Sequence, residues 1–541
     1  MSPVYESEYY SAMRDLERPG RSPVHSTHGM AATSQPLATL TAINVLQDGG
    51  NAMDAAVAAC AVQCVVEPGS TGIGGDCFAL FAPAGGPIVG FNGSGRAPAA
   101  ATADWYAEQG IAAIERTTPH AVTVPGAIDA WSQLLADHGT RSLGEVLGPA
   151  IGYARDGYPV HSRTAHDFAL SADILMLDPA AARIYLPGGR PPKVGTVHRQ
   201  PELAETLAHI AEHGRDGFYH GHVAGDIVSH LRSLGGLHTL DDFAAAKGEY
   251  VQPISVNYRG YDIYQCPPNG QGITALQMLN ILAHFDLGAL DPLSVDRFHL
   301  LIEATRLAYR ERDTHLADPG KVDVPVDMML SGARASEFAG AIDMDRAMGF
   351  EPRRRVPEHV DTVYLCVVDK DLNAVSFINS LFSNFGSGLC GPKTGVLLQN
   401  RGIGFVLDPD HPNCIAPHKR PLHTLIPGMV AKDGEVIMPF GVMGGHYQPV
   451  GHTTFLTNLI DFGLDLQEAI DSPRIFATPG GKVEVEGTVP EDIRRGLEDR
   501  GHELTAPAKP IGGGQAIRID RDEGVLTGAS EPRKDGYALG Y

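Results

Sequence analysis

The sequence lacks the features of several large classes of protein. It contains no run of about 18 apolar residues, so no segment is expected to form a membrane-spanning helix. Lysine and arginine total 42 against 64 aspartates and glutamates, and the formal charge of -22 opposes binding to nucleic acid or to an anionic membrane. The first residues carry acids where a signal peptide needs bases and an apolar run, so we expect a cytoplasmic protein.

Cysteine is sparse and scattered. Seven cysteines, an odd number, do not indicate a disulfide framework in a chain of 541 residues. Cys60 and Cys64 are one helical turn apart and could form a metal pair, but small core side chains are the simpler interpretation. His220 and His222 also have metal-like spacing, without an evident third ligand. We therefore expect neither a metal nor a cofactor.

What is present is the composition of a soluble globular protein, 43% hydrophobic and 20% charged. Apolar periodicity predicts helices at 37–48, 52–65, 127–137, 143–156, 201–213, 275–284 and 295–314. It predicts strands at 79–82, 260–265, 363–368, 374–379, 429–431 and near 483–486. Strands are denser in the C-terminal third, which suggests strands stacked between helical layers, with the sheet residues coming late in the chain.

Two glycine clusters interrupt this pattern. The first, Gly72 to Asp76, lacks the Lys-Ser/Thr pair of a P-loop and the flanking strand of a dinucleotide fingerprint. Its glycines are better explained by a close approach of backbone to backbone or to substrate. The second, Gly444 and Gly445, follows an apolar segment, and adjacent backbone N–H groups there could form an oxyanion hole.

Thr362 stands at the head of an apolar strand, immediately after Asp361. If the peptide bond between them were cut, Thr362 would become an N-terminal nucleophile whose own α-amine serves as the base. Such a residue needs no separate histidine, in keeping with a sequence that has no Gly-x-Ser-x-Gly elbow and no His-Glu-x-x-His motif. Taken alone, however, an Asp-Thr pair is more often structural.

The segments around Thr362 form an ordered series. DTVYLCVVDKDLNAVSFINSLFSNFGSG is followed by TGVLLQNRG, KRPLHTLIP and GVMGGH, and upstream lie GGNAMDAAVAA, GSTGIGGDCFAL and PPNGQGITALQMLNIL. From about His25 to the C-terminus, the chain resembles the gamma-glutamyltransferase (glutathione hydrolase) family of Ntn hydrolases. Within it, the chain is similar to a divergent cytosolic branch that includes oxamate amidohydrolases and cephalosporin-acylase-like proteins.

The resemblance implies an α/β (α+β) fold, a four-layer αββα sandwich formed from a self-cleaved precursor. Residues 1–361 would be the large chain and residues 362–541 the small chain of one composite domain. Thr362 would first cleave the bond after Asp361 and then attack a substrate amide, with Gly444 and Gly445 holding the oxyanion. Thr424 would offer a hydroxyl to Thr362 or to the substrate. The two cleaved chains would form a heterodimer, and two such heterodimers could assemble into a larger dimer.

The substrate pocket departs from the family pattern. Ser380 and Phe382 stand where gamma-glutamyl enzymes have a Thr-Leu-Asn segment, so the substrate-holding asparagine is missing. Arg401 replaces a side chain that binds the substrate's α-ammonium, and Gly404 replaces an aspartate. Losing an acid and gaining a guanidinium disfavours an ammonium and favours a carboxylate.

Two further positions have two interpretations each. His423 and Thr424 replace the family's paired serines, and His423 either binds substrate or fills space. In FNGSGRAP, Asn92 stands where the family has its carboxylate-binding arginine, and Arg96 either compensates or is a solvated loop residue.

These features predict a self-processing threonine amidohydrolase that cleaves a small carboxylate-bearing amide, oxamate-like or gamma-glutamyl-like, with hydrolysis favoured over transfer. One alternative is a true gamma-glutamyltransferase or glutathione hydrolase. An alternative of another class is an unprocessed, non-catalytic binding protein.

Overall fold

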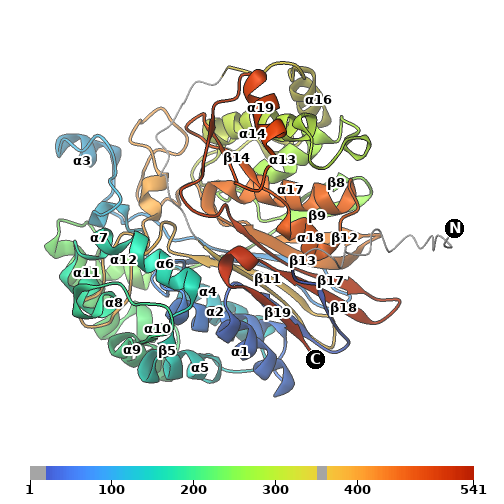
Figure 1. Cartoon of the computed structure of the whole chain (residues 1–541). Coiled ribbons are helices and arrows are strands. Elements are labelled where there is room, and N and C mark those ends of the chain that lie inside the picture. Colours follow the sequence, from blue (N-terminus) through green and yellow to red (C-terminus); the bar gives the residue numbers. More distant parts are fainter. Residues whose placement is uncertain (1–19, 350–361) are drawn as a thin grey trace.

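Two seven-stranded sheets lie at the centre of the computed structural model, which describes residues 20–349 and 362–541 (Figure 1). The first sheet has the order β1 (Val24–Ser26), β18 (Val525–Ser530), β17 (Gly513–Asp520), β13 (Glu435–Met443), β12 (Gly428–Lys432), β9 (Tyr261–Gln265), β8 (Ile254–Tyr258). The second has the order β19 (Tyr537–Gly540), β2 (Met30–Thr33), β10 (Val363–Val368), β11 (Ala374–Ser380), β3 (Asp76–Ala82), β4 (Val89–Gly93), β7 (Glu249–Val251).

The two sheets pack face to face through a shared apolar core. Phe78 and Tyr364 enter it from the second sheet, and Met429, Met443 and Ile517 enter it from the first. Strands covered on both faces are apolar at nearly every position rather than alternating, as β10 and β3 are here.

Helices cover both outer faces. On the second sheet lie α1 (Pro36–Gln47), α2 (Ala52–Val66), α4 (Ala127–His138), α5 (Leu143–Asp156) and α9 (Pro201–His213). On the first sheet lie α13 (Gly272–Leu282), α14 (Val295–His315), α17 (Gln448–Ile460), α18 (Leu466–Asp471) and α19 (Glu491–Asp499). The layers therefore run helix, sheet, sheet, helix, which confirms the predicted four-layer sandwich.

Shorter elements surround these layers. The remaining helices are α3 (Ala103–Glu108), α6 (Ser162–Leu170), α7 (Ala172–Leu175), α8 (Pro179–Tyr185), α10 (Asp216–Tyr219), α11 (Gly221–Ser233), α12 (Leu240–Ala244), α15 (Val326–Met329) and α16 (Gly332–Gly340). Two small sheets contain β5 (Tyr158–Pro159) with β6 (Val197–His198), and β14 (Ile475–Ala477), β15 (Val483–Val485) and β16 (Leu504–Thr505). Among the described residues, no helix is both long and apolar enough to cross a lipid bilayer.

The predicted helices and strands all appear, with ends that differ by a few residues. One expectation is wrong: the sheet residues do not come late. Strands β2, β3 and β4 come from the first hundred residues and flank the β10–β11 hairpin. The second sheet thus joins segments far apart in the sequence, which periodicity within one segment does not reveal.

The helix α2 shows why the cysteine pair is a core feature. Asn51 and Asp54 form a capping box at its start, and all of its residues are buried. Cys60 and Cys64 lie inside this helix as buried thiols, and burial raises the pKa of Cys60 well above its usual value. A neutral thiol packed on all sides behaves as a small apolar side chain.

Candidate active site

Thr362 lies at the start of β10, in the interior of the second sheet. Its side chain is fully buried, and its hydroxyl donates a hydrogen bond to Ser380 Oγ at 3.2 Å. Ser380 is the last residue of β11, the strand paired with β10, so the hairpin itself brings the two hydroxyls together. Asp361, the other half of the predicted cleavage site, lies outside the described residues.

Phe382 follows Ser380 in an unusual conformation. Its backbone N–H donates to Ser380 Oγ at 2.8 Å, and its φ of 81° is uncommon for a bulky residue. This backbone turn directs the ring beneath the guanidinium of Arg401, whose central carbon lies 4.5 Å from the ring centroid. Thr362, Ser380, Phe382 and Arg401 therefore form one continuous cluster.

Arg401 is the charged member of this cluster. It is 1% exposed, and it donates one hydrogen bond, from Nη1 to Thr424 Oγ1 at 2.6 Å. Its Nε and Nη2 atoms are buried and have no hydrogen-bond partner among the described residues. Burial lowers the pKa of Arg401 to about 9, so the guanidinium stays charged at neutral pH. A buried guanidinium with two open donors is suited to an anion.

Asp76 is the acid whose negative charge acts on Arg401, yet both of its carboxylate oxygens already accept hydrogen bonds from other groups. Its Oδ2 accepts from His423 Nε2 at 3.0 Å. Its Oδ1 accepts from the backbone N–H of Gly126 at 3.1 Å and from Gln399 Nε2 at 2.9 Å. The carboxylate is thus held by three donors and does not pair directly with the guanidinium.

His423 has both ring nitrogens occupied. The backbone N–H of Leu425 donates to Nδ1 at 3.2 Å, so the proton lies on Nε2, which donates to Asp76. Burial, reinforced by the charge of Arg401, lowers the pKa of His423 to about 4. At neutral pH the ring is therefore uncharged, and its hydrogen bond orients Asp76. Its predicted contact with substrate stays a prediction.

The predicted oxyanion glycines lie in a turn at the end of β13. Gly444 and Gly445 both adopt positive φ angles, 121° and 58°. A Cβ at Gly444 would lie 2.9 Å from the Cα of Gly512, so only glycine fits this turn without displacement. The conformation leaves successive backbone N–H groups in a tight turn, an arrangement that suits a developing oxyanion.

Gln271 connects the glycine turn to Thr424. Its Nε2 donates to the backbone carbonyls of Gly445 at 2.8 Å and Thr424 at 3.1 Å. Its Oε1 accepts from Arg312 Nη1 at 3.1 Å, and the same atom of Arg312 lies 3.2 Å from His446 Nδ1. This buried network fixes the turn and the Thr424 segment relative to each other.

Arg96 lies among other partners. Its Nη1 is 3.5 Å from Asp318 and donates to the carbonyl of His418 at 3.0 Å, with about a third of the side chain exposed. Asn92 is buried and bonds to Asn269 at 2.9 Å. The structure thus brings Arg401, rather than Arg96, into the cluster around Thr362. A carboxylate-binding role for Arg96 stays a prediction.

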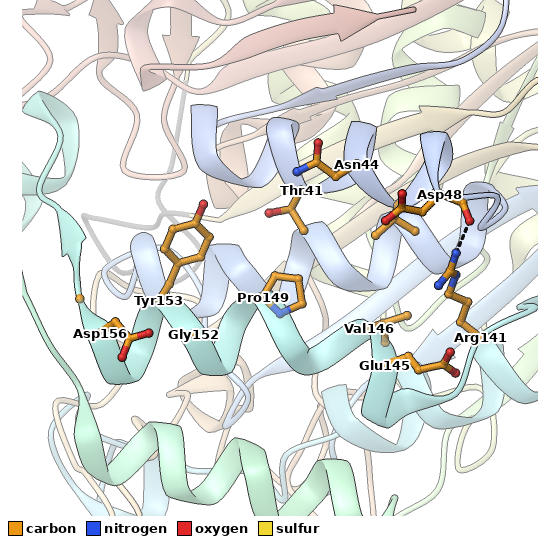
Figure 2. Close-up of a pocket in the computed structure, with 12 residues that line it drawn as sticks. Thr41, Asn44, Asp48, Arg141, Glu145, Val146, Pro149, Gly152, Tyr153 and Asp156 are labelled. Atoms are coloured by element: carbon orange, nitrogen blue, oxygen red, sulfur yellow. Dashed lines mark hydrogen bonds between the residues drawn. The ribbon is translucent and has the colours of Figure 1, made fainter.

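A groove of about 540 Å³ lies between α1 and α5 in the outer helical layer (Figure 2). Asn44, Asp48, Arg141, Glu145 and Tyr153 are among its lining residues, and none of them belongs to the Thr362 cluster. Arg141 donates to the carbonyl of Asp48, and Glu145 accepts from the N–H of Ser142 to cap α5. Arg141 and Glu145 in this groove therefore stabilise the ends of the neighbouring helices.

Comparison with known proteins agrees with this geometry. A model of the family described as Gamma-glutamyltranspeptidase matches residues 38–541. The chain belongs to this family. Its members and their acylase relatives are Ntn-type hydrolases of amide bonds, and the chain is accordingly an enzyme of this type that acts on C–N amide bonds.

Three relatives place the chain within the family. It is 40% identical to the "Glutathione hydrolase-like YwrD proenzyme" of Bacillus subtilis, covering 96% of this chain and 99% of the relative. It is 35% identical to the "Oxamate amidohydrolase proenzyme" of Klebsiella pneumoniae, covering 95% and 99%. The crystal structure of cephalosporin acylase from Bacillus halodurans matches with a TM-score of 0.91 and 40% identity, covering 100% of this chain and 99% of that one.

Sequence reasoning did not single out Asp76, Gln271, Gln399 or Arg312. Asp76 carried a usable signal, since it is the one acid at the head of an otherwise apolar strand. Gln271, Gln399 and Arg312 carried none, because a buried glutamine or arginine looks like a surface residue until its neighbours are known.

Proposed function

We propose that the protein is a self-processing amidohydrolase that cleaves small amides bearing a carboxylate, with Thr362 as its N-terminal nucleophile. Thr362 Oγ would attack the preceding carbonyl, shift the chain from nitrogen to oxygen, and be released by ester hydrolysis. Two chains, residues 1–361 and 362–541, would then form a heterodimer. Several relatives are named as proenzymes, which supports this step.

In turnover the freed α-amine of Thr362 would take the hydroxyl proton as Oγ attacks the substrate carbonyl. The backbone N–H groups of Gly444 and Gly445 would hold the oxyanion. Collapse of the intermediate expels the amine, which takes the proton, and leaves an acyl ester on Thr362. Water would then discharge the ester and release a carboxylic acid.

The observation that carries the substrate assignment is the buried guanidinium of Arg401, with Nε and Nη2 unpartnered among the described residues. A substrate carboxylate could accept from both atoms, which would offset the cost of burying the charge. Asp76, the acid whose charge acts on Arg401, is already engaged by three donors, so it offers little to an α-ammonium. An oxamate-like substrate fits this charge pattern better than a gamma-glutamyl group.

A second candidate is hydrolysis of glutathione or another gamma-glutamyl compound. It is favoured by 40% identity to a protein named glutathione hydrolase-like. A panel of oxamate, a glutaryl amide and glutathione separates the two, with and without a dipeptide acceptor to reveal transfer. We expect the highest kcat/KM for an amide whose carboxylate lies close to the scissile bond and no rate increase from the acceptor.

Intact-mass measurement of the purified protein tests the nucleophile directly. We expect two fragments that meet between Asp361 and Thr362, a single uncut and inactive chain for Thr362→Ala, and restored cleavage for Thr362→Ser. An uncut wild-type chain would refute the mechanism and favour a non-catalytic binding protein. Cleavage with preference for glutathione would refute only the substrate assignment.

A further inference from the structure

A cluster of nitrogen and oxygen donors lies in the outer helical layer, apart from the residues assigned to catalysis. His299 and Glu303 are four residues apart on α14 and share one face of that helix. His502 approaches this face from the segment between α19 and β16. The three ligand atoms lie within 4.8 Å of one another, and all three residues are buried.

We propose that His299, Glu303 and His502 form a binding site for a zinc ion or a similar borderline divalent metal. Two imidazoles and one carboxylate are a ligand set typical of zinc, and the fourth position would be left to water. Nitrogen donors disfavour magnesium and calcium, which prefer oxygen ligands.

The orientation of His299 supports this assignment. Its Nε2 lies 2.8 Å from the backbone carbonyl of Asp343, which can only accept, so the proton is on Nε2. The lone pair of Nδ1 therefore points to His502, whose Nε2 is 2.8 Å away. A ligating histidine is usually fixed in this way by a carbonyl on its other nitrogen.

The carboxylate of Glu303 is also held in place. Met348 N–H donates to Oε2 at 2.9 Å, and Arg306 Nη1 donates to Oε1 at 3.0 Å. Each carboxylate oxygen has a second lone pair through which it can bind a metal. The positive charge of Arg306, which pairs with Glu303, opposes the binding of a cation, and so does the charge of Arg500 near His502. Arg500 is itself paired with Asp296, which offsets part of its charge.

The distance between the two imidazoles defines the adjustment that metal binding requires. At 2.8 Å the two nitrogens share a proton in a hydrogen bond. Tetrahedral zinc with Zn–N bonds of about 2.0–2.1 Å separates two ligand nitrogens by roughly 3.3 Å. Zinc bound at His502 Nε2 would displace this proton to Nδ1 of the same ring, which is buried without a hydrogen-bond partner among the described residues, and would move the rings apart by about half an ångström.

The position of the site suggests its role, which rests on the proposed cleavage. His299, Glu303 and Asp343 belong to the predicted large chain, and His502 belongs to the predicted small chain. A metal bound by residues of both would link the two products of processing. At its other end, α14 carries Arg312, which contacts the network behind the oxyanion turn.

Metal analysis of the protein purified without a polyhistidine tag tests this inference. We expect about one zinc ion per 541-residue protein in the processed wild type and the same content in uncleaved Thr362→Ala. We expect loss of the metal in His502→Ala and in His299→Ala. Because the Thr362→Ala precursor is included, failure of the proposed function leaves this measurement valid.

A second group of histidines provides the control for adventitious binding. The ring centroids of His209 and His213 are 4.1 Å apart, and those of His209 and His222 are 4.3 Å apart. These histidines are more exposed than the three residues of the proposed site. The double variant His209→Ala/His213→Ala should keep the zinc equivalent. Loss of metal in this variant, with retention in His502→Ala, would assign the zinc to the surface and overturn the proposal.

Two measurements on the unmutated protein guard against variants that fail to fold. X-ray absorption at the zinc edge should show two imidazoles among nitrogen and oxygen ligands. A chelator should lower Tm, and added zinc should restore it. Protein that contains no metal and whose Tm does not change with zinc would refute the site, and His299, Glu303 and His502 would then be held by hydrogen bonds only.

Discussion

Replacing Arg401 by methionine should separate substrate recognition from stability. Methionine fills a similar volume without charge, so the substrate carboxylate loses the two donors, Nε and Nη2, that are unpartnered among the described residues. A hydrogen bond to a charged group contributes about 1.5–3 kcal/mol. A loss of about 3 kcal/mol lowers kcat/KM for the acid roughly a hundredfold.

The folded protein should gain stability from the same change. In the free enzyme Arg401 is a buried charge without a directly paired acid, and replacing buried charges by apolar groups often stabilises by about 1–4 kcal/mol. We therefore expect Arg401→Met to raise Tm while it lowers activity on the acid. The neutral ester of the same substrate should be turned over almost as fast as by the wild type.

Arg420 offers a matched control. It is also buried, but its guanidinium donates to the carbonyls of Ser94 and Lys247 and pairs with Glu249. Arg420→Met should lower Tm, because it leaves these acceptors without a donor. Equal losses of kcat/KM for acid and ester in Arg401→Met, or a fall in its Tm like that of Arg420→Met, would refute the reasoning.

Three further predictions concern the groups around this pocket. The pKa of His423 is about 4 in the folded protein, against 6.5 for an ordinary histidine, so its contribution of about 3 kcal/mol to the free energy of unfolding is present above pH 6.5 and is lost as pH falls to 4. In His423→Gln, urea unfolding should therefore show a smaller loss of stability between pH 6.5 and 4, and an unchanged loss would contradict this. Gln271→Leu should lower kcat about tenfold or more with little change in KM. Gln277→Leu, inside the helix α13 that Gln271 precedes, should not; equal kinetics of the two variants would exclude Gln271 as a positioning residue. Gly444→Ala should impair processing and turnover, because its Cβ would lie 2.9 Å from Gly512. Gly434→Ala, which also has a positive φ but has open space around its Cβ, should not; normal processing of Gly444→Ala would contradict the strained turn.

Much of the fold could be predicted from local patterns. The apolar run from Val363 to Val368 and the segment from Ala374 to Asn379 indicate two strands, and the structure contains both as a pair. The helices followed from apolar periodicity, as in α2, whose start the structure shows to be fixed by a capping box. The order of strands could not be predicted in this way, because β2 and β3 join the β10–β11 hairpin across hundreds of residues, and no local pattern reports that pairing.

By itself, the sequence determined the chemistry that is available: a threonine at a strand head, a glycine pair after an apolar strand, and an arginine where an ammonium-binding side chain is expected. These are properties of residue type and order, so they can be read before folding. The tertiary structure decided which charges are balanced. It paired His423 with Asp76, left Arg401 buried with two open donors among the described residues, and joined His299 to His502, because the energy of a charge depends on neighbours that only the folded chain brings together.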